Sequence, residues 1–224
     1  MAAPARKAQI QLSILVDPDK PFAILRDARR LYRTSYPKAD FRPVDRAFRL
    51  TKRLYEGGFP GYLACAVDYH DFAHSASVFA ATSRLLDGCE LSGFALGPIL
   101  AGEVLIAAML HDTGYIRAEG DTRGTGAQYT KIHVDRSSAF VLREQEAFGL
   151  DPESAARISR MILGTDLERP WEGLVFESEK ERVAAEILAT ADLFGQMADR
   201  AYLEKLLFLY YEFREAGIGG YDSA

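Results

Sequence analysis

The chain has 224 residues, of which 48% are hydrophobic and 26% are charged, and these fractions exclude a disordered or fibrous protein. The formal net charge is -5, from 27 Lys and Arg against 32 Asp and Glu. This balance argues against a nucleic-acid-binding protein, because contacts with a phosphate backbone need clustered positive charge. Two cysteines cannot form a disulfide framework, so we expect reduced thiols in a cytoplasmic protein.

The longest apolar stretch, residues 91–110, is interrupted by residues that weaken a helix or carry charge. These are Gly93, Gly97, Pro98, Gly102 and Glu103. A lipid-spanning helix needs about 20 predominantly apolar residues, so we expect a turn followed by a buried helix. The N-terminal residues also lack the cleavage site of a targeting signal. We therefore expect no membrane partner.

Apolar residues recur with helical spacing along most of the chain, whereas the alternation typical of strands is scarce. Only residues 9–16 are a candidate strand, and 114–128 and 166–177 are expected to be irregular. The expected helices cover 21–32, 45–56, 68–86, a segment ending at Leu110, 132–148, 152–163, 179–197 and 201–216. The sequence thus predicts an all-α protein with a single domain at 1–224.

The chain has four histidines, and each lies within or at the end of an expected helix. His70 and His74 are four residues apart, so both imidazoles are expected to leave the same face of the helix at 68–86. This spacing lets two side chains serve one small site, both as ligands or one as a proton donor. It is equally compatible with two buried histidines that are satisfied by their neighbours.

Three further polar residues stand next to apolar helical segments. His111 and Asp112 follow an apolar run, and burying a carboxylate is costly unless it is paired or bound to a cation. An aspartate in the turn after a helix is the simpler explanation of Asp112 taken alone. Asp192 falls on or beside the apolar face of the helix at 179–197, where an arginine partner would also explain it.

Taken together, His74, His111, Asp112 and Asp192 supply two imidazoles and two carboxylates from three helices. A mixed nitrogen and oxygen set of this kind suits a divalent cation, with coordination positions left for water. Separate helices of a bundle would hold the ligands rigidly. We therefore expect one or two divalent ions, of Mn, Mg, Zn or Fe, as the cofactor.

The order of these residues resembles the H…HD…D pattern of the HD-domain metal-dependent phosphohydrolases. The resemblance extends over most of the chain, with a motif-bearing core at about 61–200. The segment that begins at Tyr69, YHDFAHS, also looks like the YHN-x-x-HA stretch of class I cyclic nucleotide phosphodiesterases. Asp71 stands where that stretch has Asn. The resemblance implies a single helical bundle of the HD-domain type.

The resemblance also implies roles for individual residues. His70 would be the general acid that protonates the leaving oxygen, and His74 a metal ligand, together with His111, Asp112 and Asp192. Asp112 would bridge the metals if two are bound, and would help to orient the attacking water. The catalytic residues expected from the resemblance are thus His70 and Asp112.

Two other residues are candidates for a second metal or for substrate contacts. His133 begins an expected helix, where it could also be a satisfied histidine of the first helical turn. Asp166 lies in a loop, where HD proteins often have a similar stretch and where an ordinary turn aspartate is equally compatible with the sequence.

The sequence therefore predicts a phosphohydrolase that cleaves a phosphomonoester or phosphodiester with a metal-activated water. The expected substrate is a small phosphorylated molecule such as a nucleotide or cyclic nucleotide. The first alternative is a regulatory module that binds metal and nucleotide without turnover, and the second is a metal-dependent oxygenase on the same scaffold. The aromatic and aliphatic face of the helix at 201–216 fits core packing or a homodimer contact.

Overall fold

The computed structural model describes residues 20–197 and 201–219. The candidate strand at residues 9–16 lies outside them. The described residues form eight α-helices and three short 3-10 helices, without a strand, so the all-α prediction is confirmed. The elements are α1 (Pro21–Ser35), α2 (Arg42–Tyr55), α3 (Phe72–Leu91), α4 (Pro98–Leu110), η2 (Thr113–Tyr115), η3 (Ala127–Ile132), α5 (His133–Phe148), α6 (Pro152–Leu163), η4 (Trp171–Gly173), α7 (Glu179–Met197) and α8 (Tyr202–Glu215).

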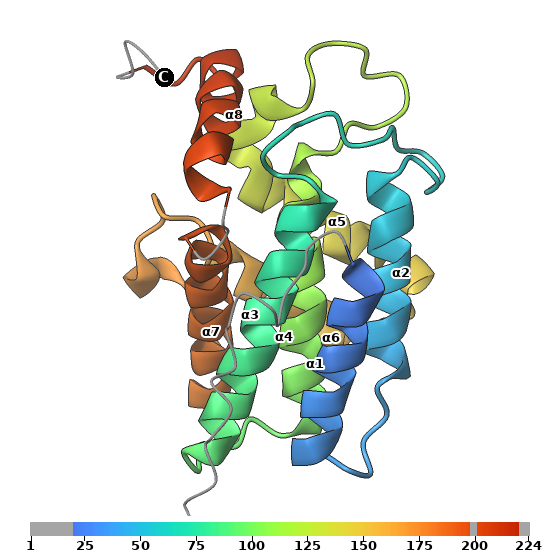
Figure 1. Ribbon diagram of the computed structural model, residues 1–224, viewed down its shortest axis with the longest axis vertical. Helices are drawn as coiled ribbons and strands as arrows, with labels where there is room; N and C mark the ends of the chain where they lie inside the picture. Colours follow the sequence, from blue (N-terminus) through green and yellow to red (C-terminus); the bar gives the residue numbers. More distant parts are fainter. Residues whose placement is uncertain (1–19, 198–200, 220–224) are drawn as a thin grey trace, which may run out of the picture.

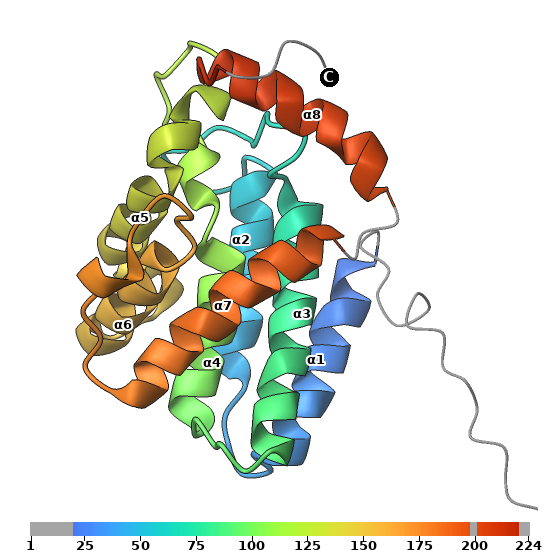
Figure 2. The same cartoon turned by 90° about the vertical axis from the view of Figure 1, so that its left-hand side faces the viewer.

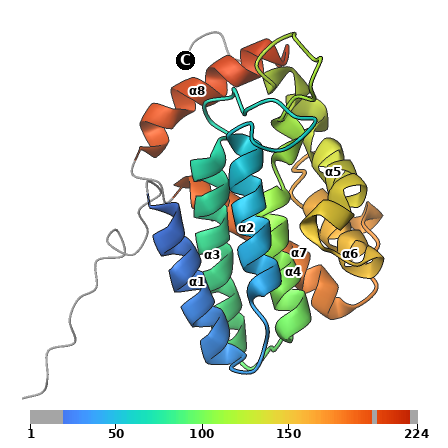
Figure 3. The same cartoon turned by 90° about the vertical axis from the view of Figure 1, so that its right-hand side faces the viewer.

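The helices α1 to α4 lie side by side along the length of the molecule (Figure 1). The pair α5 and α6 packs beside them, and α7 crosses α3 and α4 obliquely. The last helix, α8, lies across the end of the bundle where α3 begins and α4 ends (Figures 2 and 3). That end of the bundle carries the histidines.

The central helix is α4, which contacts α2, α3, α6 and α7. Every residue from Ala101 to Leu110 is buried, as expected for a helix that is apolar on all sides. The buried Glu103 in this helix is paired with Arg157 through two hydrogen bonds of 2.8 and 2.7 Å. The expectation of a buried helix is confirmed, and no helix of the described residues is long and apolar enough to cross a membrane.

Helix α3 begins at Phe72 instead of residue 68, and this changes the place of one histidine. Asp71 is the N-cap, and its Oδ1 accepts a hydrogen bond of 2.8 Å from the backbone N–H of His74. His70 therefore precedes the helix, so the expectation that His70 and His74 leave one helical face is wrong. Aspartate and asparagine are similarly favourable as N-cap residues.

Candidate metal centre

The four histidines of the chain lie close together, and His70 among them contacts Glu212 of α8. His74 lies in the first turn of α3, and His111 directly follows α4. Their ring centroids are 5.4 Å apart. The ring of His70 lies 5.7 Å from that of His74 and 6.1 Å from that of His133, the first residue of α5. Helices far apart in the sequence thus build one cluster.

Two aspartates complete a closed ring of ligand atoms with His74 and His111. Asp112 Oδ2 lies 3.3 Å from His74 Nε2 and 3.1 Å from His111 Nε2. Asp192 Oδ1, from α7, lies 3.2 Å and 3.5 Å from the same two nitrogens. The ligand atoms of His74, His111 and Asp112 lie within 4.8 Å of one another, so they form a compact group that could hold a metal ion.

These four atoms are buried, yet none makes a hydrogen bond within the described residues. The structure leaves six buried side-chain polar atoms in this condition, and four of them are His74 Nε2, His111 Nε2, Asp112 Oδ2 and Asp192 Oδ1. Such an atom costs about 1–3 kcal/mol when nothing satisfies it. A concentration of these atoms at one point indicates a missing common partner.

The spacing of the four atoms fits a metal ion as that partner. With metal–ligand bonds of about 2.1 Å, neighbouring ligands lie about 3.0 Å apart in an octahedral site and about 3.4 Å apart in a tetrahedral one. The four distances from the histidine nitrogens to the aspartate oxygens run from 3.1 to 3.5 Å. Imidazole and carboxylate donors suit a divalent transition metal, so the donor set and its spacing agree.

Backbone carbonyls fix the orientation of two imidazoles. His111 Nδ1 donates to Ala108 O at 2.9 Å, and His133 Nδ1 donates to Thr130 O at 2.6 Å. A carbonyl oxygen only accepts, so Nδ1 carries a proton in both rings and Nε2 is the nitrogen that faces the cluster. A metal ion bound there would take the place of any proton on Nε2.

The two carboxylates of the cluster also favour a positive charge beside them. Burial lowers the pKa of His74, but the carboxylates of Asp112 and Asp192 outweigh it and raise the pKa to about 9. The same carboxylates hold the pKa of His111 well above its usual range, against the effect of burial. Burial raises the carboxyl pKa values of Asp112 and Asp192, but His111 outweighs it and holds both low. A bound divalent cation would supply this positive charge in place of protons.

His133 lies on the other side of the Asp112 carboxylate from His74 and His111. Asp112 Oδ1 lies 3.6 Å from His133 Nε2, while Oδ2 faces the ring of four ligand atoms. Burial lowers the pKa of His133, although Asp112 acts in the opposite direction. The structure therefore brings His133 to the site as a neutral imidazole, on the side where a second ion or a substrate oxygen could lie.

A close backbone approach holds His133 in this position. A Cβ on Gly114 would lie 1.9 Å from the carbonyl oxygen of His133, so only glycine fits there. The N–H of Gly114 donates to Ser137 Oγ at 2.8 Å, and its carbonyl accepts from Arg136 Nε at 2.7 Å. The glycine after His111 and Asp112 thus joins this segment to α5.

Two residues at the site have no counterpart among the sequence predictions. The carboxylate of Glu212, from α8, accepts hydrogen bonds of 2.6 Å from Tyr69 N and from His70 Nδ1. The ring of Tyr115 is stacked between His70 and His133, at centroid distances of 4.3 and 4.5 Å. Glu212 is one of three glutamates in the last helix, and its place beside the apolar face of that helix is the one signal for it in the sequence. No signal in the sequence marks Tyr115.

Asp166 lies in the loop that follows α6. Its Oδ1 accepts a hydrogen bond of 3.0 Å from Glu168 N, and its Oδ2 one of 3.3 Å from Arg169 Nε. Arg169 also contacts Asp135 at 2.7 Å. These are contacts of a turn aspartate, and a role for Asp166 at the metal centre stays a prediction.

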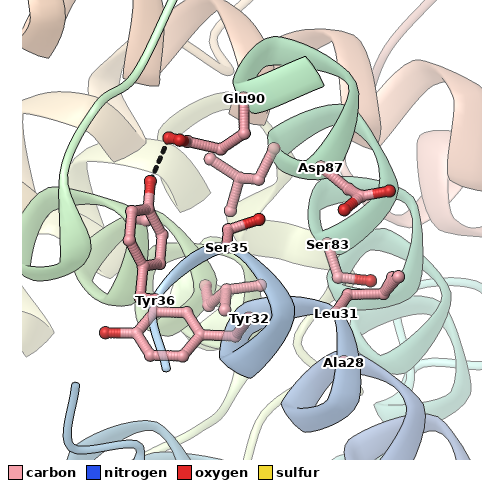
Figure 4. Close-up of a pocket in the computed structure, with 11 residues that line it drawn as sticks. Ala28, Leu31, Tyr32, Ser35, Tyr36, Ser83, Asp87 and Glu90 are labelled. Atoms are coloured by element: carbon pink, nitrogen blue, oxygen red, sulfur yellow. Dashed lines mark hydrogen bonds between the residues drawn. The ribbon is translucent and has the colours of Figure 1, made fainter. Parts of the chain in front are cut away.

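Two hollows lie at opposite ends of the bundle. One borders His74 and is lined by Tyr69, Ser77, Gln196, Tyr202 and Lys205, among others. The other, shown in Figure 4, lies between α1 and α3, where Tyr36 donates a hydrogen bond to Glu90. Only the first adjoins the candidate metal centre.

Comparison with known proteins adds one partial match. A family model described as Npun_R2479-like matches residues 118–221, which is less than half of the chain. The matched segment contains His133, Asp192 and Glu212, whereas His74, His111 and Asp112 precede it. No curated protein and no solved structure matches the chain.

Proposed function

We propose that this chain is a metal-dependent phosphohydrolase on a helical bundle of the HD type. The supporting observation is the ring of four buried ligand atoms without another partner, next to an imidazole that a buried carboxylate orients. The proposed substrate is a small phosphomonoester or phosphodiester, with a nucleotide or cyclic nucleotide as the first class to test.

In this proposal His74, His111, Asp112 and Asp192 hold the metal. A divalent cation at this position supplies a water of lowered pKa and offsets charge on the phosphoryl oxygens. Asp112 accepts a hydrogen bond from the attacking water and orients it toward phosphorus. His70 stands beside this set, with its ring 5.7 Å from that of His74, and gives a proton to the departing oxygen.

The second oxygen of Asp112 gives His133 its proposed role. Asp112 Oδ1 faces His133 Nε2 at 3.6 Å and is not part of the ring of four ligand atoms. A carboxylate that presents one oxygen to each side can bridge two ions. His133 therefore serves either a second metal or a phosphoryl oxygen of the substrate, and the metal-to-protein ratio distinguishes the two.

The test is elemental analysis of the purified protein after incubation with Mn, Mg, Zn or Fe. The wild-type chain should hold one or two ions, and Asp112→Asn, which keeps the shape of the side chain, should hold fewer. Asp87→Asn is the matched control, because Asp87 lines the hollow at the opposite end of the bundle. Absence of metal from the wild-type protein would overturn the proposal.

A second candidate is a binding module that holds metal and nucleotide without turnover. The enclosure of the site favours it, because the side chains of His74 and Asp112 are only 6% and 3% exposed. A phosphatase and phosphodiesterase screen on the metal-loaded protein separates the two candidates. Tight nucleotide binding without product would support the module, and oxygen consumption by an iron-loaded sample would instead support an oxygenase.

A further inference from the structure

The candidate metal centre is largely enclosed, and only His133 and Asp192 present part of their side chains, 22% and 18%, to the surface. His70, His111 and Asp112 are 8%, 1% and 2% exposed. The hollow beside His74 has a free volume of about 10 Å³, which is the space of about one water molecule. A phosphorylated substrate is many times larger. Part of the protein must therefore move before substrate can enter.

Helix α8 is the element best suited to move. It lies across the end of the bundle that carries the histidines and packs chiefly against η3 (Figures 2 and 3). Among its residues, which the structure describes in full, Glu212 alone is buried. Its outward face exposes apolar side chains, among them Leu203, Leu207 and Tyr211. This shallow attachment contrasts with α4, which is buried along ten consecutive residues.

Two polar contacts join the C-terminal half of α8 to the body of the protein. Glu212 receives hydrogen bonds from Tyr69 and His70, as described above. Glu215 accepts from the N–H and the hydroxyl of Thr125 at 2.7 and 2.9 Å. Thr125 lies between Gly124 and Gly126, both with positive φ angles, in the loop before η3. The helix and a glycine-containing loop thus meet directly above the site.

From these contacts we infer that α8 is a lid and that Glu212 is a positioning residue carried by it. When α8 is closed, the carboxylate of Glu212 accepts a hydrogen bond from Nδ1–H of His70, so the proton that His70 donates is the one carried on Nε2. When α8 opens to admit substrate, this carboxylate leaves and His70 is no longer held. Closure of α8 therefore orients His70 for proton donation at the same time as it encloses the substrate. The role of His70 in this inference rests on the proposed function, whereas the movement of α8 does not.

Hydrogen exchange of the full-length protein without metal tests the lid independently of activity. An isolated helix of 14 residues is marginally stable in water, so opening of α8 exposes its amides to exchange. Glu212→Ala should raise exchange at least tenfold in the peptides covering 202–215 and 120–132, with α4 and α7 unchanged. Glu204→Ala is the control, because Glu204 is an exposed carboxylate of the same helix. Unchanged exchange in α8, or an equal increase in every helix, would overturn the inference.

The positioning role has a spectroscopic signature of its own. In a histidine ¹⁵N–¹H spectrum, the wild-type protein should show His70 protonated at Nδ1. Glu212→Ala should lose this preference, while Glu212→Gln should retain part of it, because the amide oxygen still accepts a hydrogen bond. An unchanged His70 signal in Glu212→Ala would show that Glu212 does not orient this ring.

Metal exchange links the lid to the site. Thr125→Cys and Glu215→Cys, introduced into a variant with Cys65→Ser and Cys89→Ser and joined by a reducible crosslinker, should fix α8 in the closed position. Release of bound Mn²⁺ to a chelator should then slow at least tenfold and recover after reduction with a phosphine. An unchanged release rate would contradict the lid. If no metal binds, the proposed function fails, and hydrogen exchange still decides whether α8 opens.

Discussion

The two ends of the bundle both hold buried polar groups, and they differ in how those groups are satisfied. At the end shown in Figure 4, Tyr36 donates to Glu90, whose carboxylate also accepts from Leu96 N at 3.2 Å, and Tyr32 donates to Pro98 O at 2.8 Å. At the histidine end, two Nε2 atoms and two carboxylate oxygens converge without hydrogen bonds. The polar groups named at the first end satisfy one another with hydrogen bonds, whereas those at the second need a bound proton or cation.

This difference separates a structural cluster from a candidate site. Each such buried polar atom costs about 1–3 kcal/mol when neither a proton nor a cation satisfies it. Such a cost persists where the groups serve binding or catalysis. A metal ion at the histidine end removes the cost, so substitutions and metal removal should affect the two ends differently.

The largest expected effect is on turnover when the ligand ring is broken. Asp112→Asn removes one negative charge and one strong ligand, so phosphoester hydrolysis should fall by about 10³-fold or more. Initial rates of the metal-loaded proteins, with whichever substrate the screen identifies, measure this loss. Asp87→Asn at the other end should keep the wild-type rate. Equal losses in both variants would mean that the two ends do not differ in function.

The next effect separates proton donation from metal binding. His70→Ala should reduce turnover by about 10²–10⁴-fold, the usual contribution of a general acid, while the metal content stays at the wild-type level. Elemental analysis and single-turnover kinetics on the same preparation measure both quantities. Loss of stoichiometric metal from His70→Ala would instead identify His70 as a ligand.

A smaller effect is the pH dependence of the metal-free protein. The pKa of His74 rises from 6.5 to about 9 in the folded state, so its stabilising contribution is complete below about pH 6.5 and is lost as the pH rises through about 9. His111 has the same sign. Asp112 and Asp192 are ionised throughout this window, because their pKa values are lowered.

Urea unfolding at pH 6.5, 8 and 9.5 in the presence of a chelator measures this loss. The free energy of unfolding should decrease by roughly 3 kcal/mol across the series, from the shift of His74 alone. Bound metal replaces the protons, so the metal-loaded protein should show a smaller decrease. A metal-free protein whose stability is constant across this range would contradict the assigned electrostatics.

The helical architecture and the four residues of the candidate metal centre could be predicted from the sequence. Helical periodicity and caps such as Asp151 and Pro152, which begin α6, act through neighbouring residues, so they can be recognised in a linear pattern. Only four histidines are available, and a set with metal-binding chemistry was sufficient to select His74, His111, Asp112 and Asp192.

The features that were missed depend on contacts between distant segments. Glu212 lies 142 residues after His70, and its meeting with that ring is set by how α8 folds back over the bundle. Tyr115 is one of several buried tyrosines, and only the tertiary structure places it between two imidazoles. Gly114 reads as a helix-ending residue, whereas its lack of a side chain is needed for the approach to His133. The start of α3 is set by the N-cap Asp71, whereas the helical spacing of residues 68–86 alone does not mark this boundary.

The smallest expected effect is at the end of the bundle shown in Figure 4, where the polar side chains are hydrogen-bonded to one another. Tyr36→Phe removes the hydroxyl that donates to Glu90, and the free energy of unfolding should fall by about 1 kcal/mol. The loss is limited because the carboxylate of Glu90 keeps the hydrogen bond from Leu96 N and the site is half-buried. Metal content and turnover should stay at wild-type levels, since the hollow of Figure 4 is at the opposite end from the histidines. Urea unfolding and elemental analysis of the same sample check both parts. A change in metal content would mean that the two ends are coupled through α3, the helix that carries both Glu90 and His74.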